Sequence, residues 1–536
     1  MERPSIIAVI VLTYVFLFLI PPQNFPINDD PIFYLSVKNY VQGGSIWVHP
    51  YVTPTFILQD IYGIIISKIF GLSHKVLMAS TMVIAGICVI ATYFLLRSFF
   101  SKGFALIGSM ILLTNPIFYN LSHSFMTDVP ALTFTALSIF AIFRGIIDKK
   151  DSYLFIGSLL AILSFMIRQT AIIPIAGVFM YLILKKELNA KKIMALGLLP
   201  IIIIFIWSYG YYFVHGPSSN ITLDNEVSFM LDNWIHLPYV LFKIVTYIGF
   251  FFFPAGFVYM LNYNRVLRDF LNLSKSKIIP ILAVILSMLV PIYKFIANKR
   301  YIMPFGANII EPEWLGPVYV AGTKGNLFPD FLWIPITLLS FITIFCIFLY
   351  ALKLPEENKY KLLLCITSSY ALMSLHIYHL DRYYLPIVVV FIPIVIFSLK
   401  DLKFGKEGLI LMILIFGTWS FYGTYDYFSW NSARWNAIEY LLDQGVPVDA
   451  IDGGIEYNLL NFLYNPPFSL YNAKFGCAIN SSYLISINSK EFNGEVPYNT
   501  ACRVKLYGKY TSIKSFDYYG PFGEKLGTIY VLKKIL

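Results

Sequence analysis

The chain begins with a strongly apolar run, IIAVIVLTYVFLFLI at residues 6–20, and soon reaches an acidic pair in NDDPIFYL at residues 28–35. A membrane-spanning helix needs about 20 mostly apolar residues, and such segments recur along the chain to about residue 423. Only 13% of the residues are charged and 58% are hydrophobic, whereas soluble domains carry roughly 25% charged residues. The sequence therefore predicts an α-helical integral membrane protein, with the acidic pair placed where the first span leaves the membrane.

About thirteen spans are expected. They lie at residues 4–20, 75–97, 103–114, 129–146, 153–168, 170–185, 193–213, 237–262, 278–296, 331–352, 361–377, 384–399 and 408–423. The first run could instead be a signal peptide, but the following PPQNFP lacks a small-residue cleavage site, so we predict a retained helix. The loop at 21–74 is too long for a turn, and 30–42 and 54–70 within it are expected to form amphipathic surface helices.

Basic residues decide the predicted orientation. Lysines and arginines are concentrated in alternate loops, as in KKELNAKK at 185–192, and are much scarcer in the loops between them. The positive-inside rule then places the N-terminus in the cytoplasm, and an odd number of spans places the C-terminus outside. We expect a multi-pass protein of the plasma (inner) membrane. The formal charge of +10 is explained by these basic loops, so nucleic-acid binding is not expected.

A change in composition divides the chain. Residues 1–423 are predicted to form the transmembrane body, and the more polar residues 424–536 a small extracytoplasmic α/β domain. In this tail, residues 435–442 have helical spacing before Gly445, and SSYLISI and GTIYVLKKI alternate as strands do. Asp452-Gly453-Gly454 fits a ligand loop but is more typical of a structural turn. Cys477 and Cys502 could form a disulfide in an oxidising compartment, and Cys88, Cys346 and Cys365 lie in apolar segments that suit packing.

Ionisable residues from distant segments are expected to share one depth. In the predicted topology, Asp29, Asp30, Asp128, Arg168 and Arg382 all lie near the outer ends of spans. Charges at membrane depth are costly unless they are paired or solvated, so they indicate function. Each alone has a simpler explanation: an arginine can extend to the interface, and Asp128 in TDVP can cap a helix N-terminus.

The chemistry that suits these residues is transfer from a lipid phosphate. The sequence has neither a phosphate-binding GxxxxGK[ST] loop nor a GxGxxG fingerprint, which disfavours a nucleotide donor. An aspartate can act as general base on an acceptor hydroxyl, and arginines can bind a phosphate leaving group.

Three stretches, DDPIFY (29–34), LSHSFMTDVPAL (121–132) and RYYLP (382–386), together resemble the GT-C superfamily of glycosyltransferases. More narrowly, they are similar to the branch that uses polyprenyl-phosphate sugars, related to protein O-mannosyltransferases and lipid A aminoarabinose transferases. The resemblance implies a GT-C fold and an inverting transfer to a glycan, lipid or protein acceptor. It implies that Asp29 is the catalytic carboxylate. Asp30 stands where relatives often have glutamate, and Pro31 follows it directly; these departures leave the choice between Asp29 and Asp30 open. Asp128 would support the site, and Arg382 and Arg168 would bind the lipid phosphate.

Some relatives hold a divalent ion on the outer side, where His123, His376 and His379 are expected. No metal-ligand spacing such as HExxH is present, so no metal site is assigned and a divalent cation stays an open alternative as cofactor. Two other functions also stay open. A transporter or flippase of lipid-linked glycans would favour two related halves, which the sequence does not show, and an oligosaccharide ligase would use a pyrophosphate carrier.

Overall fold

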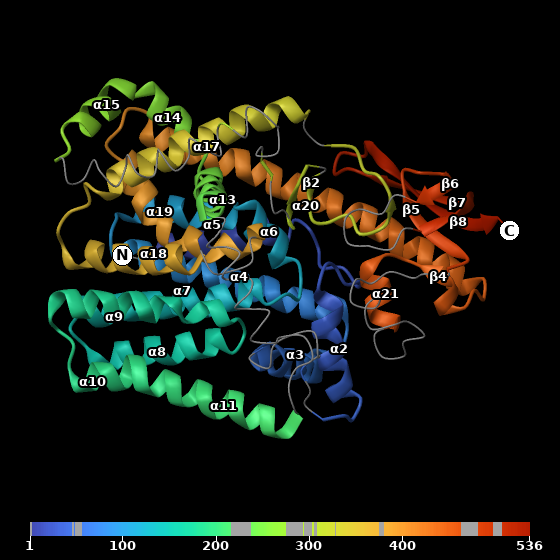
Figure 1. The fold of residues 1–536 in the computed structure, drawn as a ribbon, viewed down its shortest axis with the longest axis horizontal. Helices are drawn as coiled ribbons and strands as arrows, with labels where there is room; N and C mark the ends of the chain where they lie inside the picture. Colours follow the sequence, from blue (N-terminus) through green and yellow to red (C-terminus); the bar gives the residue numbers. More distant parts are fainter. Residues whose placement is uncertain are drawn as a thin grey trace.

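The computed structural model describes most of the chain: residues 3–45, 48, 56–215, 237–274, 293, 303–304, 308–312, 314–326, 329–374, 380–462, 481–496 and 506–535. The helices pack side by side into one bundle, and the β-strands gather at the end of the molecule that holds the C-terminus (Figure 1). The protein is thus mainly helical, as predicted.

Each predicted span contains helix, except 278–296, of which the structure describes residue 293 alone. The bundle helices are α1 (Arg3–Leu17), α4 (His74–Arg97), α5 (Lys102–Leu113), α7 (Asp128–Ile147), α8 (Asp151–Phe165), α9 (Ile173–Lys185), α11 (Leu199–His215), α13 (Leu237–Phe250), α14 (Ala255–Leu261), α17 (Asp330–Ala351), α18 (Asn358–Ser374), α19 (Leu385–Leu399) and α20 (Gly405–Asp443). Within the described residues, six helices are long and apolar enough to cross a membrane, or up to eight if each of two bent pairs is one span. The number thirteen stays a prediction.

The helices divide into a buried centre and an apolar rim. In the stretch Asp381–Leu399, which includes α19, 83% of the residues in the 18-residue apolar window are buried, whereas in Ala190–Trp207, which leads into α11, only 11% are buried. Large apolar side chains are exposed along this rim, including Ile201, Phe205 and Ile206. Contiguous exposed apolar surface of this kind suits contact with lipid. The free cysteines Cys88, Cys346 and Cys365 are buried in the bundle, as predicted, and Cys477 and Cys502 lie outside the described residues.

Two segments bend sharply. The predicted span 237–262 is not one straight helix, because α13 and α14 meet at 84° around residues 251–254. Pro254 at this break has no N–H to continue the helical ladder. At the other bend, α5 and α6 (Pro116–Ser122) meet at 66°, and Asn115 caps α6 by accepting the backbone N–H groups of Ile117 and Phe118.

The loop after α1 forms the two surface helices that the sequence predicts, α2 (Asp30–Val41) and α3 (Ile57–Phe70). Their inner faces close over a small core of Phe33, Val37, Ile64, Leu77 and Phe125. The Nε2 of Gln59 on α3 also donates to the carbonyl oxygen of Phe125 at 3.0 Å. This packing holds α2 and α3 against the segment that leads into α7.

The bundle is joined to the C-terminal sheet by α20. This 39-residue helix runs through the predicted boundary at residues 423 and 424 without a break and extends to the sheet (Figure 1). It ends just before Gly445, whose φ of +74° lies in the left-handed region that glycine adopts easily.

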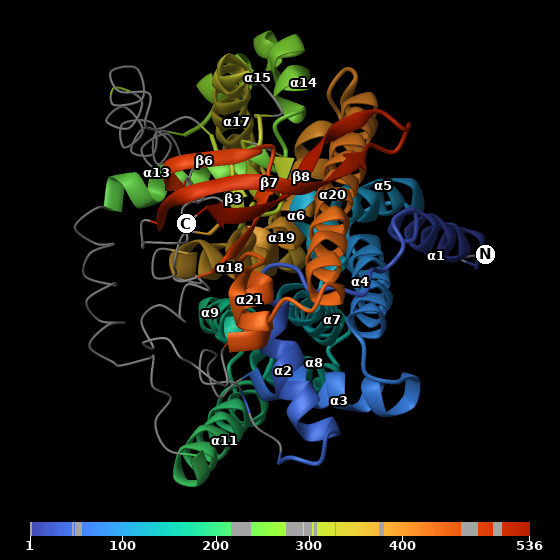
Figure 2. The same cartoon turned by 90° about the vertical axis from the view of Figure 1, so that its right-hand side faces the viewer.

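The sheet contains β3 (Ala321–Gly322), β4 (Ile451–Asp452), β5 (Tyr483–Ile487), β6 (Glu491–Val496), β7 (Leu506–Tyr519) and β8 (Lys525–Ile535). Its order is β3-β5-β8-β7-β6, with β4 also paired to β5. Figure 2 shows β6, β7 and β8 running side by side at this end of the molecule. The alternating runs predicted as strands are β5 and β8. Because β3 comes from the segment before α17, the sheet includes residues that the sequence assigns to a loop of the membrane body.

Candidate active site

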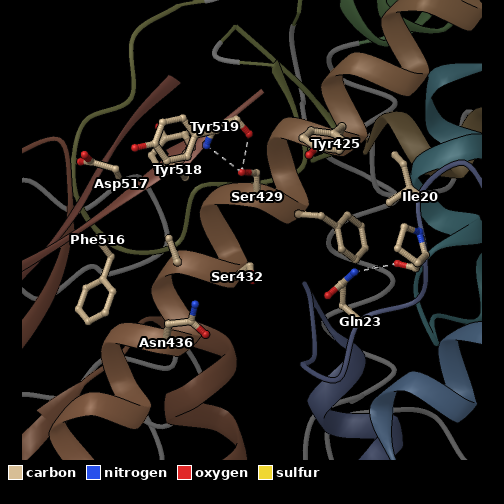
Figure 3. Close-up of a pocket in the computed structure, with 13 residues that line it drawn as sticks. Ile20, Gln23, Tyr425, Ser429, Ser432, Asn436, Phe516, Asp517, Tyr518 and Tyr519 are labelled. Carbon is tan, nitrogen blue, oxygen red and sulfur yellow. Dashed lines mark hydrogen bonds between the residues drawn. The ribbon is translucent and has the colours of Figure 1, made fainter. Parts of the chain in front are cut away.

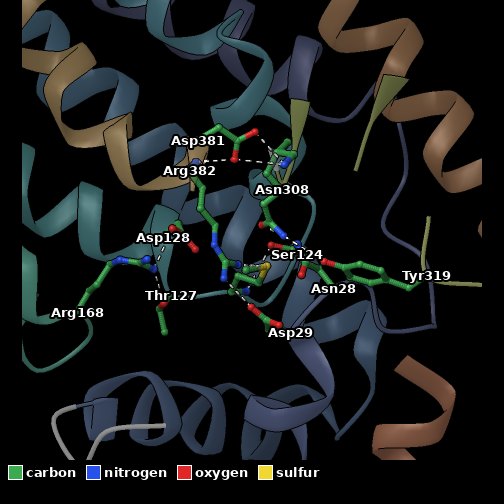
Figure 4. A network of polar contacts seen from close by, with 12 residues as sticks. Asn28, Asp29, Ser124, Thr127, Asp128, Arg168, Asn308, Tyr319, Asp381 and Arg382 are labelled. Carbon is green, nitrogen blue, oxygen red and sulfur yellow. Dashed lines mark hydrogen bonds and ion pairs between the residues drawn. The ribbon is translucent and has the colours of Figure 1, made fainter. Parts of the chain in front are cut away.

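An ion pair joins the acidic loop to the start of α19. Asp29 is the last residue before α2, and Arg382 lies in the short 3-10 helix η4 (Asp381–Tyr384) that leads into α19. The Asp29 Oδ2 and Arg382 Nη2 atoms are 2.8 Å apart (Figure 4). The Arg382 side chain is 9% exposed and that of Asp29 is 40% exposed. The carboxylate is therefore accessible, whereas the guanidinium is almost enclosed.

A second ion pair lies next to the first. Asp128 is the first residue of α7, and its Oδ1 is 2.8 Å from Arg168 Nη1. The ring of Tyr383 lies under both arginines, with its centroid 4.5 Å from the Cζ of Arg168 and 5.5 Å from that of Arg382. Figure 4 shows the Arg382 side chain passing between Asp128 and Asp29. The structure thus brings four of the predicted site residues together from four distant segments.

The helix cap considered for Asp128 is not formed. Thr127 is the N-cap residue of α7 and makes no side-chain capping bond. The Oδ2 of Asp128 is buried and has no hydrogen-bond partner among the described residues. One oxygen of this carboxylate thus pairs with Arg168, and the other is enclosed without a described partner.

Asp30, the second acid of the pair, faces away from the arginines. It is buried, and its carboxyl accepts the backbone N–H of Phe125 at 2.9 Å and that of Ile27 at 3.4 Å. Burial raises the pKa of Asp30 well above its ordinary value, the carboxylates of Asp29 and Glu456 add to the rise, and the two N–H groups oppose it. The geometry therefore separates the two acids: Asp29 faces Arg382, and Asp30 anchors the segment before α7.

Several residues that hold this cluster in place were not predicted from the sequence. Asp381 is fully buried and accepts the backbone N–H groups of Ile310 at 2.6 Å, Arg382 at 2.7 Å and Ile309 at 2.9 Å. The loop before α17 is thereby fixed beside Arg382. The only sequence signal was the position of Asp381 next to Arg382 in HIYHLDRYY.

Asn28 forms the other edge of the cluster. Its Nδ2 donates to Asn308 Oδ1 at 3.3 Å, and Asn308 Nδ2 donates to the Tyr319 hydroxyl at 3.3 Å (Figure 4). Asn28 is buried and has a φ of +53°, in the left-handed region. These amides link the acidic loop to the loop before α17, and no short motif marks them in the sequence.

Among the described residues, no cluster of side chains is suited to bind a metal ion. In the part of the chain that the structure describes, no group of three or more His, Cys, Asp or Glu side chains could hold a metal ion. His123 is buried, and its two ring nitrogens lie 2.8 and 2.9 Å from the carbonyl oxygens of Tyr119 and Leu17. His376 and His379 lie outside the described residues.

Two hollows lie apart from the four charged residues. An apolar groove of about 470 Å³ runs between α3 and α4, and its lining includes Tyr62, Ile66, Ala79 and Val83. The other hollow, of about 530 Å³, lies between α20 and β7 (Figure 3).

Ser429 ties α20 to β7 across the second hollow. Its hydroxyl donates to the carbonyl oxygen of Tyr519 at 2.8 Å and accepts the N–H of Tyr519 at 3.2 Å. Gln23, Ser432 and Asn436 add polar groups to the lining. None of Asp29, Asp128, Arg168 or Arg382 lines this hollow, so it is distinct from the charged cluster.

Residues 61–209 match the family model of dolichyl-phosphate-mannose-protein mannosyltransferases. This segment contains Asp128 and Arg168 but neither Asp29 nor Arg382. The match confirms the predicted resemblance to protein mannosyltransferases over these residues. No curated protein matches the chain.

Among solved structures, the chain is similar to ArnT from Cupriavidus metallidurans bound to undecaprenyl phosphate, with 10% identity and a TM-score of 0.46 over 77% of this chain. It is also similar to the oligosaccharyltransferase AglB from Archaeoglobus fulgidus in complex with an inhibitory peptide and a dolichol-phosphate, with 15% identity and a TM-score of 0.43 over 82% of this chain. The chain spans 64% of the length of ArnT and 60% of that of AglB.

Proposed function

We propose that this protein transfers one sugar from a polyprenyl-phosphate carrier to a hydroxyl group of a glycan, lipid or protein acceptor. The observation that carries the proposal is the convergence of an accessible carboxylate, Asp29, with two arginines that come from distant segments. The matched family, whose name specifies dolichyl-phosphate-mannose as donor, supports a lipid-phosphate sugar.

In the proposed reaction, Asp29 accepts the proton of the acceptor hydroxyl, and the oxygen attacks the anomeric carbon of the donor sugar. A new C–O bond forms with inversion, and the bond between the anomeric carbon and the phosphate oxygen breaks. The electron pair of that bond stays on the polyprenyl phosphate. Arg382 and Arg168 stabilise the added negative charge, since guanidinium groups match phosphate oxygens in geometry and charge. Asp128 holds Arg168 in place.

The apolar groove between α3 and α4 suits part of the isoprenoid chain. Its walls are aliphatic and aromatic. Tyr62 in the groove packs against Phe125 with ring centroids 6.1 Å apart, and the N–H of Phe125 binds Asp30. A lipid in the groove would therefore lie against the same segment that supports the charged cluster.

The distribution of charge along α7 supports a site on the extracytoplasmic face. Asp128 begins this helix, whereas Arg144, Lys149 and Lys150 lie at its other end. Basic residues favour the cytoplasmic side, so the Asp128 end would face outward. The C-terminal sheet would then lie outside the plasma membrane and the N-terminus in the cytoplasm.

The test is a transfer assay with Asp29→Asn and with Asp128→Asn. Purified protein in lipid nanodiscs is given radiolabelled dolichyl-phosphate-mannose or another polyprenyl-phosphate hexose or pentose, together with a membrane extract as acceptor. We expect the wild type to label an acceptor with one of these donors and Asp29→Asn to lose the activity while keeping its melting temperature. Full activity in both variants, with normal folding, would refute the assignment. Label that needs a pyrophosphate-linked glycan would indicate a ligase, and lipid movement without a covalent product a flippase.

A further inference from the structure

A fully buried ion pair in the C-terminal part of the chain contacts the loop that precedes α2 and contains Asp29. Glu456 on α21 (Ile455–Phe462) and Arg434 on α20 are each 0% exposed, and Glu456 Oε2 lies 2.8 Å from Arg434 Nη1. The second oxygen of the same carboxylate, Oε1, accepts the backbone N–H of Asn28 at 3.0 Å. Glu456 thus bridges α20 and the residue that directly precedes Asp29.

The conformation of Asn28 explains why this contact matters for Asp29. A non-glycine residue in the left-handed region carries a conformational energy cost, although asparagine tolerates it better than most residues. Two bonds oppose this cost: the side chain binds Asn308, and the backbone N–H binds Glu456. The left-handed turn at Asn28 sends its own side chain toward Asn308 and Tyr319, and the Asp29 side chain toward Arg382 (Figure 4).

The helix α21 also supports the loop at Asn28 indirectly, through Tyr319 and Asn308. The backbone N–H of Ile455 donates to the carbonyl oxygen of Tyr319 at 3.1 Å. The Tyr319 hydroxyl accepts a bond from Asn308, which binds Asn28. The start of α21 is itself fixed by Asp452, whose Oδ1 accepts the N–H of Gly454 at 3.1 Å, so the Asp-Gly-Gly stretch is a structural turn.

Stability alone does not account for the Glu456–Arg434 pair. Replacing a buried ion pair by apolar residues is often neutral or stabilising, because desolvation of both charges offsets their attraction. A carboxylate at this position can instead bind a guanidinium with one oxygen and a backbone amide with the other. An apolar residue could not hold Asn28.

We propose that Glu456 is a positioning residue for Asp29, so that α21 of the C-terminal domain completes the active site of the membrane body. The proposal rests on the proposed role of Asp29. It assigns the C-terminal domain a part in catalysis that does not require contact with either substrate.

The test compares Glu456→Ala and Glu456→Gln with a control, Asp426→Asn. Asp426 on α20 forms another buried ion pair, with Lys324, and makes no described bond to residues 27–30. Glutamine keeps an oxygen for the Asn28 amide, so Glu456→Gln should show a smaller defect than Glu456→Ala. If Glu456→Ala does not fold, the same measurements are made on Glu456→Gln.

Four quantities are measured: hydrogen–deuterium exchange of the peptide 21–35, affinity for undecaprenyl phosphate, and kcat and KM with the donor that the wild type uses. For Glu456→Ala we expect faster exchange at 21–35 and a kcat lower by roughly ten- to a hundredfold, since small misplacements of a catalytic group have effects of this size. KM and undecaprenyl phosphate affinity should stay within about twofold, and Asp426→Asn should leave all four quantities near wild type.

Unchanged exchange at 21–35 in both Glu456 variants, or an equal loss of kcat in Asp426→Asn, would overturn the inference. If the proposed role of Asp29 is wrong, the transfer assay will instead show full activity of Asp29→Asn. The exchange measurement does not depend on activity and decides the Glu456 contact in either case.

Discussion

Replacing Arg382 with alanine is expected to weaken binding of a polyprenyl phosphate much more than it destabilises the protein. The reason is the unequal exposure of the ion pair, 9% for Arg382 and 40% for Asp29. When the guanidinium is removed, the remaining carboxylate is within reach of water. Partly exposed ion pairs contribute roughly 0–1 kcal/mol, and the lost contact with Tyr383 adds a similar amount. We therefore expect the free energy of unfolding to fall by about 1–2 kcal/mol.

The expected loss of ligand affinity follows from the strength of a hydrogen bond to a charged group. A hydrogen bond to a charged group contributes about 1.5–3 kcal/mol, which corresponds to roughly a 10- to 150-fold change in Kd. Arg382→Ala should raise the Kd for undecaprenyl phosphate by this factor. Arg382→Lys should recover part of the affinity, because an ammonium keeps the charge but cannot bind two phosphate oxygens in parallel.

The assay is a titration of undecaprenyl phosphate into the purified protein in nanodiscs, with the melting temperature measured on the same samples. Arg144→Ala is the matched control, because Arg144 pairs with Asp148 at 2.7 Å in the last turn of α7, at the opposite end from Asp128. Its Kd should stay within about twofold of wild type. A folded Arg382→Ala protein with the wild-type Kd would show that the pair with Asp29 is only structural.

Two further predictions concern Asp30 and the apolar groove. Because burial raises the pKa of Asp30, its contribution to stability is complete below its ordinary pKa, about 4, and is lost as pH rises through the raised folded value. Asp30→Asn keeps an oxygen for the Phe125 amide and removes this titration, so its melting temperature relative to wild type should rise between pH 4 and pH 8; a constant difference would contradict the reasoning. In the groove, Ala79→Phe should raise the KM for the lipid donor roughly tenfold, whereas Ala176→Phe on the exposed face of α9 should not, and equal KM values would remove the groove from the proposal.

Hydropathy was sufficient to predict the helices of the bundle, because burial in lipid acts on each segment independently of the rest of the chain. It also separated α2 and α3 from the spans, since both are short and interrupted by polar residues. The bend at residues 251–254 was missed, because FFFP is as apolar as the segments on either side.

The continuity of α20 was also missed. The sequence becomes polar near residue 424, and this change in composition is not accompanied by any break in the helix.

The candidate site was predictable only in part. Charges near span ends can be located by counting, so Asp29, Asp128, Arg168 and Arg382 were found. Asp381 and Glu456 were not, because each acts on backbone N–H groups of a distant loop, and hydrogen bonding to a backbone leaves no pattern in the partner's sequence. The different partners of Asp29 and Asp30 likewise needed coordinates, since adjacent residues on a turn face different directions.

The short contact between Asp29 and Arg382 has a consequence for the order of events in the proposed reaction. Before transfer, the donor phosphate is a diester with one negative charge, and Asp29 shares Arg382 with it. As the acceptor proton moves to Asp29, the carboxylate loses its charge, and the leaving phosphate gains one. Arg382 is then attracted less by Asp29 and more by the phosphate, without any change in the total charge of the site. A single guanidinium 2.8 Å from the base would thus couple proton transfer to departure of the lipid phosphate, because stabilisation lost at one anion is gained at the other.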